Sequence, residues 1–142
     1  MEIKLKRLND DAVLPDKAYD DAAGYDLYSV EEKVIESGGF SGIKTGWSIQ
    51  LPPRTEAQIR PKSGLAIRHG VTVLNAPGTI DPDYRGEIIV ILINHGADAF
   101  VVEKGSKIAQ MVISELCDTR LSTVDELDET SRDARGFGSS GR

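Results

Sequence analysis

Short runs of β-branched and aliphatic residues, separated by turn-forming residues, indicate a fold made mainly of strands. The most apolar run, Glu87–Asn94, is rich in isoleucine and valine, which favour a buried strand over a helix. Residues 3–8 alternate apolar and charged side chains, the pattern of a half-buried strand. Fourteen glycines and six prolines punctuate the chain. We therefore expect an all-β sandwich or barrel.

Five shorter strands and one helix complete the expected secondary structure. The strands are expected at residues 47–51, 57–59, 71–74, 100–102 and 108–113. Pro52 and Pro53 separate the first two, because proline interrupts or borders a sheet. A helix of about two turns is expected over residues 63–70, since Ser63 is a good N-cap residue and Gly70 a good C-terminal stop.

The length of 142 residues is typical of one domain. The chain has no apolar run near the roughly 20 residues that span a bilayer, and it does not open with a signal peptide. We therefore expect neither a membrane nor a secreted protein. The one cysteine, Cys117, excludes an internal disulfide and a zinc site built from several cysteines. A cytoplasmic location is expected on these grounds.

The chain is acidic, with 17 basic against 23 acidic residues and a net charge of −6. Proteins that hold nucleic acid through its phosphates usually carry a basic face, so stable nucleic-acid binding is not expected. A small anionic ligand remains compatible with this charge, because physiological salt screens exposed charges beyond about 8 Å. A few well-placed lysines and arginines are enough to hold a phosphate group.

The C-terminal part of the chain differs from the rest. Residues 115–129 carry six carboxylates against Arg120, which is typical of a solvated loop or a surface helix. Residues 130–142 have almost nothing to bury except Phe137. We expect a β domain over residues 1–129 and a flexible arm over residues 130–142, ordered only when a ligand or another subunit holds it.

Ordering this arm requires a charged ligand. Fixing six of its residues costs roughly 6–12 kcal/mol of backbone entropy. Stacking an aromatic ring on one base contributes only about 1–3 kcal/mol. Phe137 can supply the stacking, and the planar guanidinium of Arg132 can meet a phosphate. A polyphosphate ligand therefore fits the arm, although a Gly/Ser/Arg tail is also the composition of an ordinary linker.

Residues 60–64 place two cations and a hydroxyl at the start of the expected helix. Free backbone N–H groups and the helix dipole favour an anion at such a position. Ser63 could donate to a phosphate oxygen or act as an ordinary cap, and the segment alone leaves both interpretations open.

Residues 75–86 form a polar hairpin between two expected strands. Pro77 and Gly78 suit the central positions of a type II turn, and the side chain of Asp83 could brace a second turn. Asp81 is a candidate general base, and Tyr84 offers a flat face to a sugar. Taken singly, these residues are also common turn formers.

Taken together and in order, these segments resemble the five motifs of the all-β dUTP diphosphatase (dUTPase) family. The matching segments are residues 22–29, 60–66, 75–87, 105–110 and 132–141. The resemblance implies a jelly-roll-like β fold and a homotrimer with three active sites at subunit interfaces. One subunit gives the base-binding hairpin, a second gives the phosphate-binding segments, and a third gives its C-terminal arm.

The activity implied by the resemblance is hydrolysis of dUTP to dUMP and pyrophosphate, which limits uracil in DNA and supplies dUMP for thymidylate synthesis. Mg²⁺ is implied as a cofactor held by the triphosphate and water, with no direct protein ligand. Asp81 would orient and deprotonate the attacking water, and Gln110 would help hold that water or a phosphate oxygen. Asp26 is expected to act through water or by bracing a neighbouring arginine.

Specificity is implied to come from the hairpin. Asn75 and the backbone of residues 78–80 would pair with the uracil edge, leaving no room for a thymine methyl group. Tyr84 would pack on deoxyribose and exclude a 2′-hydroxyl. The implied substrate-binding residues are Lys62, Ser63, Gly64, Asn75, Gly78, Thr79, Ile80, Tyr84, Ile89, Arg132, Phe137, Gly138 and Ser139, with Asp26 and Asp83 supporting them.

Two departures and two alternatives stand beside this resemblance. Lys62 occupies a position where the family more often has arginine, so a bidentate phosphate contact becomes a point charge. Residues 132–136 are less glycine-rich than in many members. One alternative is a dCTP deaminase of the same broad fold, alone or as a bifunctional enzyme. The other is a non-catalytic nucleotide-binding regulator, against which the presence of Asp81 argues.

Overall fold

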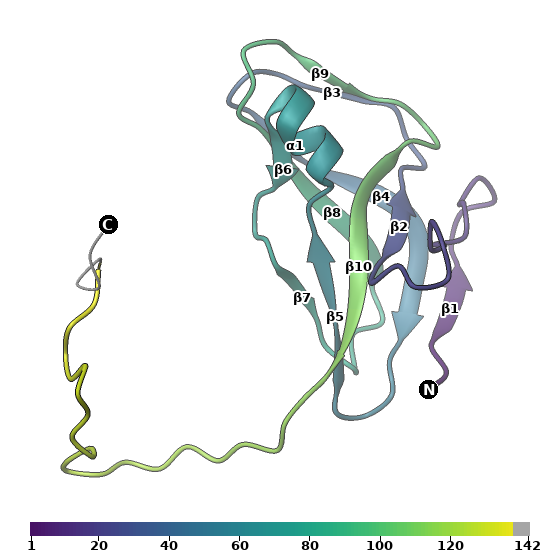
Figure 1. Ribbon diagram of the computed structural model, residues 1–142. Coiled ribbons are helices and arrows are strands. Elements are labelled where there is room, and N and C mark those ends of the chain that lie inside the picture. Colours follow the sequence, from purple (N-terminus) through teal and green to yellow (C-terminus); the bar gives the residue numbers. More distant parts are fainter. Residues whose placement is uncertain (138–142) are drawn as a thin grey trace.

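Two four-stranded antiparallel sheets and a two-stranded ribbon make up the fold in the computed structural model of the chain, which describes residues 1–137 (Figure 1). The elements are β1 (Lys4–Arg7), β2 (Tyr25–Tyr28), β3 (Lys33–Ile35), β4 (Phe40–Gln50), β5 (Thr55–Arg60), α1 (Ser63–His69), β6 (Val71–Val73), β7 (Gly78–Ile80), β8 (Glu87–Asn94), β9 (Phe100–Val102) and β10 (Lys107–Glu115). The first sheet has the order β1-β4-β8-β6 and the second β2-β10-β5-β7, while β3 pairs with β9. The jelly-roll-like all-β fold is thus confirmed.

The core lies between the two sheets. Alternate residues of β8 point into it, since Ile88, Val90 and Leu92 are almost completely buried. The indole N–H of Trp47 donates to the carbonyl of Val13 at 2.8 Å, which satisfies its polar atom inside this apolar layer. The strand predicted at residues 87–94 is confirmed with the same bounds.

A glycine allows β4 to pass tightly under the N-terminal segment. Gly46 has φ 75°, and a Cβ at this position would lie 2.7 Å from Ala12 Cβ and 2.9 Å from Val30 Cγ1. The pairing of β4 with β8 shifts register between Lys44 and Ser48, around this glycine. Both the left-handed backbone and the close approach exclude a side chain here.

Two details of the predicted local structure are wrong. The N-cap of α1 is Lys62 rather than Ser63, and the helix has no side-chain capping hydrogen bond, although Gly70 does end it with a left-handed φ of 66°. Pro77 and Gly78 do not form a type II turn. Gly78 instead opens β7, where it pairs with Ile59, and its φ lies outside the left-handed region that the third residue of such a turn requires.

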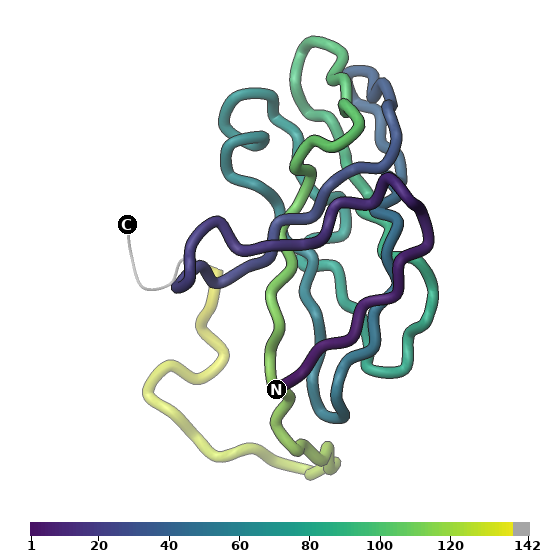
Figure 2. The backbone as a smooth tube through the Cα atoms, turned by 90° about the vertical axis from the view of Figure 1, so that its right-hand side faces the viewer, coloured from purple at the N-terminus to yellow at the C-terminus, as the bar shows by residue number. Residues whose placement is uncertain are grey.

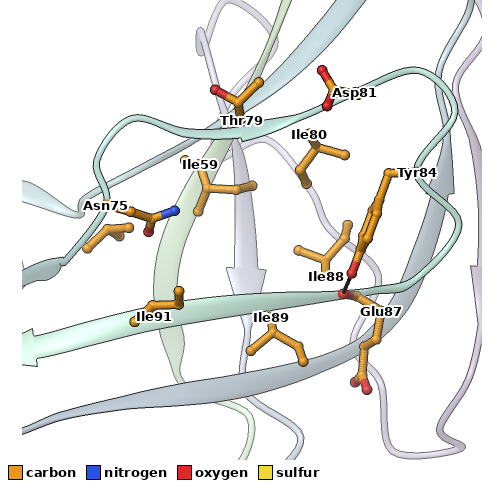
Figure 3. A pocket seen from close by; sticks show the side chains of 12 residues that line it. Ile59, Asn75, Thr79, Ile80, Asp81, Tyr84, Glu87, Ile88, Ile89 and Ile91 are labelled. Atoms are coloured by element: carbon orange, nitrogen blue, oxygen red, sulfur yellow. Dashed lines mark hydrogen bonds between the residues drawn. The ribbon is translucent and has the colours of Figure 1, made fainter.

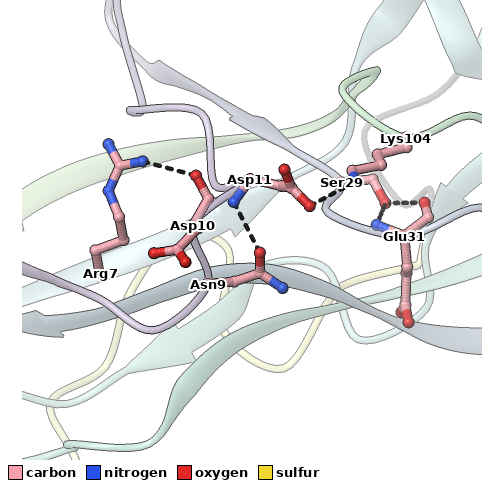
Figure 4. Close-up of polar contacts among 7 residues, drawn as sticks. All are labelled: Arg7, Asn9, Asp10, Asp11, Ser29, Glu31 and Lys104. Atoms are coloured by element: carbon pink, nitrogen blue, oxygen red, sulfur yellow. Dashed lines mark hydrogen bonds and ion pairs between the residues drawn. The ribbon is translucent and has the colours of Figure 1, made fainter.

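The segment after β1 is tied down by polar contacts (Figure 4). A guanidinium nitrogen of Arg7 donates to the carbonyl of Asp10 at 3.2 Å, and the Asp11 N–H donates to the side chain of Asn9 at 2.9 Å. Lys104, in the loop between β9 and β10, lies 2.5 Å from the Asp11 carboxylate. This exposed ion pair joins the N-terminal segment to the loop between β9 and β10.

Beyond β10 the chain leaves the body of the molecule (Figures 1 and 2). Leu116 still donates to the carbonyl of Arg54, and Asp118 lies 3.5 Å from the Arg54 guanidinium. Residues 115–135 are exposed throughout. The predicted division at residue 129 stays a prediction, and the last strand ends earlier, at Glu115. Among residues 1–137, no helix has the length and apolar character needed to cross a membrane.

Candidate functional site

A pocket opens beside the hairpin that joins β6 to β8 (Figure 3). Its volume is about 170 Å³. The walls are apolar, formed by isoleucines of three strands, and polar side chains stand at the rim. The pocket is lined by Ile59, Val73, Asn75, Gly78, Thr79, Ile80, Asp81, Tyr84, Glu87, Ile88, Ile89 and Ile91. An apolar hollow with a few polar groups is the usual form of a small-molecule site.

Strand β7 separates the two kinds of side chain. Ile80 is buried and points into the hollow, while the exposed side chains of Thr79 and Asp81 stand at the rim and point away from Ile80 (Figure 3). Asn75 approaches Gly78 closely, since a Cβ on that glycine would lie 3.2 Å from Asn75 Nδ2 and 3.3 Å from Ile59 Cβ. The missing side chain therefore lets the Asn75 amide lie against the backbone of β7. The structure thus brings together seven of the predicted site residues: Asn75, Gly78, Thr79, Ile80, Asp81, Tyr84 and Ile89.

The turn after Asp81 is held by backbone contacts and by an arginine. Tyr84 N–H donates to the carbonyl of Asp81 at 3.2 Å, and the Tyr84 hydroxyl donates to the carbonyl of Glu87 at 2.9 Å. Arg85 donates to the carbonyls of Pro82 and Tyr84, at 2.7 and 2.9 Å. Arg85 takes the bracing role predicted for Asp83, whose side chain makes no hydrogen bond within the described residues.

A second cluster lies on β2 and its neighbours. The Asp26 carboxylate is buried, with Lys62 Nζ 2.5 Å from Oδ1 and Lys107 Nζ 2.7 Å from Oδ2. Burial alone would raise the pKa of Asp26, but the ammonium groups of Lys107 and Lys62 outweigh it and hold this pKa below its usual value. The same contact raises the pKa of Lys107. Two ammonium groups against one carboxylate leave a net positive charge available to an anion.

This pairing corrects one expectation and adds one residue. Asp26 braces two lysines rather than an arginine. Lys107 was not singled out from the sequence, although it lies within the motif at residues 105–110. Its contact depends on an irregularity in β10, where the register with β2 shifts between Lys107 and Ala109. In a regular strand, residues three apart point to opposite faces of the sheet. The register shift instead brings Lys107 and Gln110 to the same face, the one that carries Asp26.

Gln110 lies next to the segment that precedes α1. Its side-chain N–H donates to the carbonyl of Pro61 at 3.0 Å, and a Cβ on Gly24 would lie 3.1 Å from its Oε1. Ser63 begins the helix with an exposed side chain that is not used as a cap. A Cβ on Gly64 would meet only the flexible end of Arg68, at 3.0 Å. The Ser63 hydroxyl and the Gln110 amide therefore flank the cluster of Asp26, Lys62 and Lys107.

The pocket and this cluster lie apart within the chain. Strand β7 borders the pocket and β2 carries Asp26, and the two are opposite edges of one sheet. Three strand spacings separate them, about 14 Å. The two groups are also separated along the length of β5. Asp81 follows Ile80, which pairs with Ala57 near the start of β5, whereas Lys62 lies beyond the end of that strand. Ala57 and Arg60 are three residues apart, about 10 Å along the strand.

The predicted arm residues lie apart from both groups. Arg132 donates from Nε to the carbonyl of Arg135 at 2.8 Å, and both Arg132 and Phe137 are exposed. Gly138 and Ser139 lie outside the described residues. Within residues 1–137 the structure therefore places the predicted site residues in three groups: the hairpin pocket, the lysine cluster and the arm.

Comparisons with known proteins agree with one another. The sequence pattern of the family described as dUTPase matches residues 10–141. The chain is 58% identical over 139 residues to the deoxyuridine 5′-triphosphate nucleotidohydrolase of Alkaliphilus metalliredigens, covering 98% of this chain and 96% of that protein. The protein of the same name from Clostridioides difficile is 55% identical, with 98% and 97% covered. The dUTPase of Staphylococcus bacteriophage 80alpha, solved with dUpNHpp, superposes with a TM-score of 0.91 at 25% identity, covering 99% of both chains.

Proposed function

The chain belongs to the dUTPase family, and from that membership we propose that it hydrolyses dUTP to dUMP and pyrophosphate at sites shared between the subunits of a homotrimer. The observation that carries the proposal is the hairpin pocket, where Asn75, Asp81 and Tyr84 surround an isoleucine-lined hollow.

The pocket fits the nucleoside part of the substrate. The Asn75 amide and the backbone groups of β7 offer both donors and acceptors to the edge of a uracil ring. Cytosine presents a different pattern, which would leave these groups unpaired at a cost of about 1–3 kcal/mol each. The ring of Tyr84 packs against the deoxyribose, and Ile89 forms part of the apolar floor.

The lysine cluster fits the phosphates. Lys62 and Lys107 each contact the Asp26 carboxylate, which fixes both ammonium groups in place. The side chain of Ser63 and the backbone at Gly64 add hydrogen-bond donors at the same end of the sheet. Fixed donors of this kind stabilise the charge that develops on phosphate oxygens in the transition state.

The separation of the two groups supports a shared site. A distance of about 14 Å across the sheet and a further 10 Å along β5 keep Asp81 of one protomer away from its own lysine cluster. A neighbouring subunit can bring its cluster to the pocket without this restriction. The exposed C-terminal arm, with Arg132 and Phe137 free of the body, is suited to reach a third subunit.

The chemical step uses the rim of the pocket. The Asp81 carboxylate accepts a proton from a water molecule whose oxygen forms a bond to the α-phosphorus. The bond between the α-phosphorus and the oxygen bridging to the β-phosphate breaks, and pyrophosphate leaves. Gln110 of the adjacent subunit orients the water or a phosphate oxygen, since its amide already lies beside residues 61–63.

A Mg²⁺ ion bound to the triphosphate would neutralise its charge and orient it for attack, which contributes several kcal/mol. Mg²⁺ prefers oxygen ligands, retains several waters and often uses substrate phosphates in place of a protein cage. The described residues hold no group of three His, Cys, Asp or Glu side chains that could form such a cage. The buried Asp26 carboxylate is already neutralised by two lysines, so it suits a supporting role better than direct coordination.

The proposal is tested by measuring pyrophosphate release from eight nucleoside triphosphates, the four common ribo- and the four deoxyribonucleotides with dUTP in place of dTTP. We expect dUTP to be hydrolysed far faster than the rest. Ammonia release from dCTP would identify a deaminase instead, and binding of dUTP without turnover would identify a regulator. We also propose a cytoplasmic location, where the single Cys117 stays reduced, and no stable binding of nucleic acid.

A further inference from the structure

The ring of Tyr84 lies directly over the backbone of Gly86. A Cβ built on Gly86 would lie 2.3 Å from the phenolic oxygen of Tyr84, 2.5 Å from Cζ and 2.9 Å from Cε2. Carbon atoms in contact are normally about 3.5–4.0 Å apart. No side chain other than hydrogen therefore fits beneath the ring while Tyr84 keeps this position.

The requirement at Gly86 is one of space and not of backbone conformation. Its φ angle lies outside the left-handed region, unlike those of Gly46 and Gly70. Alanine could adopt this backbone, so the turn itself does not demand glycine. The specific consequence of a methyl group here is displacement of the Tyr84 ring.

The ring is also held by a hydrogen bond at this same phenolic end. The Tyr84 hydroxyl donates to the carbonyl of Glu87 (Figure 3). The Glu87 carboxylate in turn accepts from Gly46 N–H at 2.8 Å. Glu87 is thus anchored between β8 and the irregular part of β4. The hydrogen bond fixes the phenolic oxygen, and the absence of a side chain at Gly86 allows the ring to lie close enough to the backbone to make this bond.

We infer that Gly86 is a positioning residue that sets how closely the Tyr84 ring approaches the backbone of the turn. Through this position of the ring, Gly86 sets the discrimination between deoxyribose and ribose. The inference rests on the proposed function, in which this ring packs against the sugar. Restoring a normal contact moves the ring by about 1 Å, and a displacement of that size can cost 10²-fold in rate. The displaced ring no longer closes the space that a 2′-hydroxyl would occupy.

The test compares kcat/KM for dUTP and for UTP in the full-length enzyme. We expect Gly86→Ala to lower kcat/KM for dUTP by roughly 10- to 100-fold and to change the value for UTP much less, so that the dUTP/UTP ratio falls. Gly39→Ala is the matched control, because Gly39 lies in the turn between β3 and β4, has a φ outside the left-handed region and does not line the pocket. A Cβ there would lie 3.1 Å from the Glu36 carbonyl oxygen and 3.6 Å from Glu36 N, so this variant also strains a turn but leaves Tyr84 in place. Its dUTP/UTP ratio should equal that of wild type.

A second background separates a positioning role from a general structural one. In Tyr84→Ala the clashing ring is absent, so adding Gly86→Ala should change the dUTP/UTP ratio by less than twofold. An equal loss in both backgrounds, or a wild-type ratio in Gly86→Ala alone, overturns the inference. If Tyr84→Ala by itself leaves the ratio unchanged, the sugar-packing role in the proposed function fails instead, which keeps the two results distinct.

Discussion

Replacing Asp26 by asparagine removes the carboxylate that two lysines share while keeping the size of the side chain. Contacts to charged groups contribute about 1.5–3 kcal/mol each. The side chains of Lys62 and Lys107 are 28% and 46% exposed, so both can recover water when the carboxylate is lost, and the two contributions are not lost in full. We expect Asp26→Asn to lower the free energy of unfolding by about 2 kcal/mol per chain.

The assay is thermal unfolding at fixed protein concentration. The entropy of unfolding is about 2.1 cal/mol/K per residue, or roughly 0.3 kcal/mol/K for this chain, so 2 kcal/mol lowers Tm by about 7 °C. The control is Asp11→Asn, which breaks the Lys104–Asp11 pair. That pair has the same 2.5 Å separation, but its side chains are 53% and 59% exposed. A surface pair contributes under about 1 kcal/mol, so Tm should fall by less than 3 °C.

The difference between wild type and Asp26→Asn should also depend on pH. The folded-state pKa of Asp26 is lowered, so its stabilisation is fully present above the ordinary aspartate pKa of about 4 and is lost as pH falls through the lowered value. The pKa of Lys107 is raised, so the stabilisation from this group is fully present below the ordinary lysine pKa and is lost only as pH rises through the raised value. The Tm gap should be constant between about pH 5 and 8 and shrink below pH 4. Equal Tm losses in Asp26→Asn and Asp11→Asn at pH 7 would refute this reasoning.

Three further predictions concern the arm, the tight glycine in β4 and the metal. Truncation after Thr130 should lower dUTP hydrolysis about 100-fold or more, because Arg132 and the ring of Phe137 are lost, while size-exclusion chromatography still shows the assembled protein; dissociation would make the arm structural. Gly46→Ala should destabilise the fold by more than about 2 kcal/mol in urea unfolding, since it adds both a strained φ and a clash, and an unchanged midpoint would contradict the fit described for this residue. EDTA should abolish turnover and added Mg²⁺ should restore it, whereas full activity in EDTA would exclude a metal-assisted step.

The strands with an apolar, β-branched composition could be predicted from the sequence. The strands that form only because a partner strand lies beside them were missed. The strand at Glu87–Asn94 is apolar throughout, so it could be placed without knowledge of the fold. Strands β2, β3 and β7 have only three or four residues each. All three include a polar or charged residue: Asp26 in β2, Lys33 in β3 and Thr79 in β7. Such strands form because β10, β9 and β5 supply their partners, which is a property of the tertiary structure.

The site residues likewise divide into those that the motifs identified and those that only the packing shows. The order of the motifs identified the hairpin residues, and the structure does gather Asn75, Asp81 and Tyr84 around one pocket. The contact between Asp26 and Lys107 could not be read from the sequence, because it depends on the register shift in β10. The bare backbone of Gly86 under a tyrosine ring is likewise a matter of packing, since glycine at this position also suits an ordinary turn.

The role of Asp81 is tested most directly by Asp81→Asn, with two quantities measured on one preparation. The first is pyrophosphate release from dUTP, and the second is the affinity for the imido analogue dUpNHpp. Removing a general base typically costs 10²–10⁴-fold in rate, so we expect hydrolysis to fall by about that factor while the analogue binds nearly as tightly as to wild type. Hydrolysis at the wild-type rate would remove the hairpin carboxylate from the chemical step.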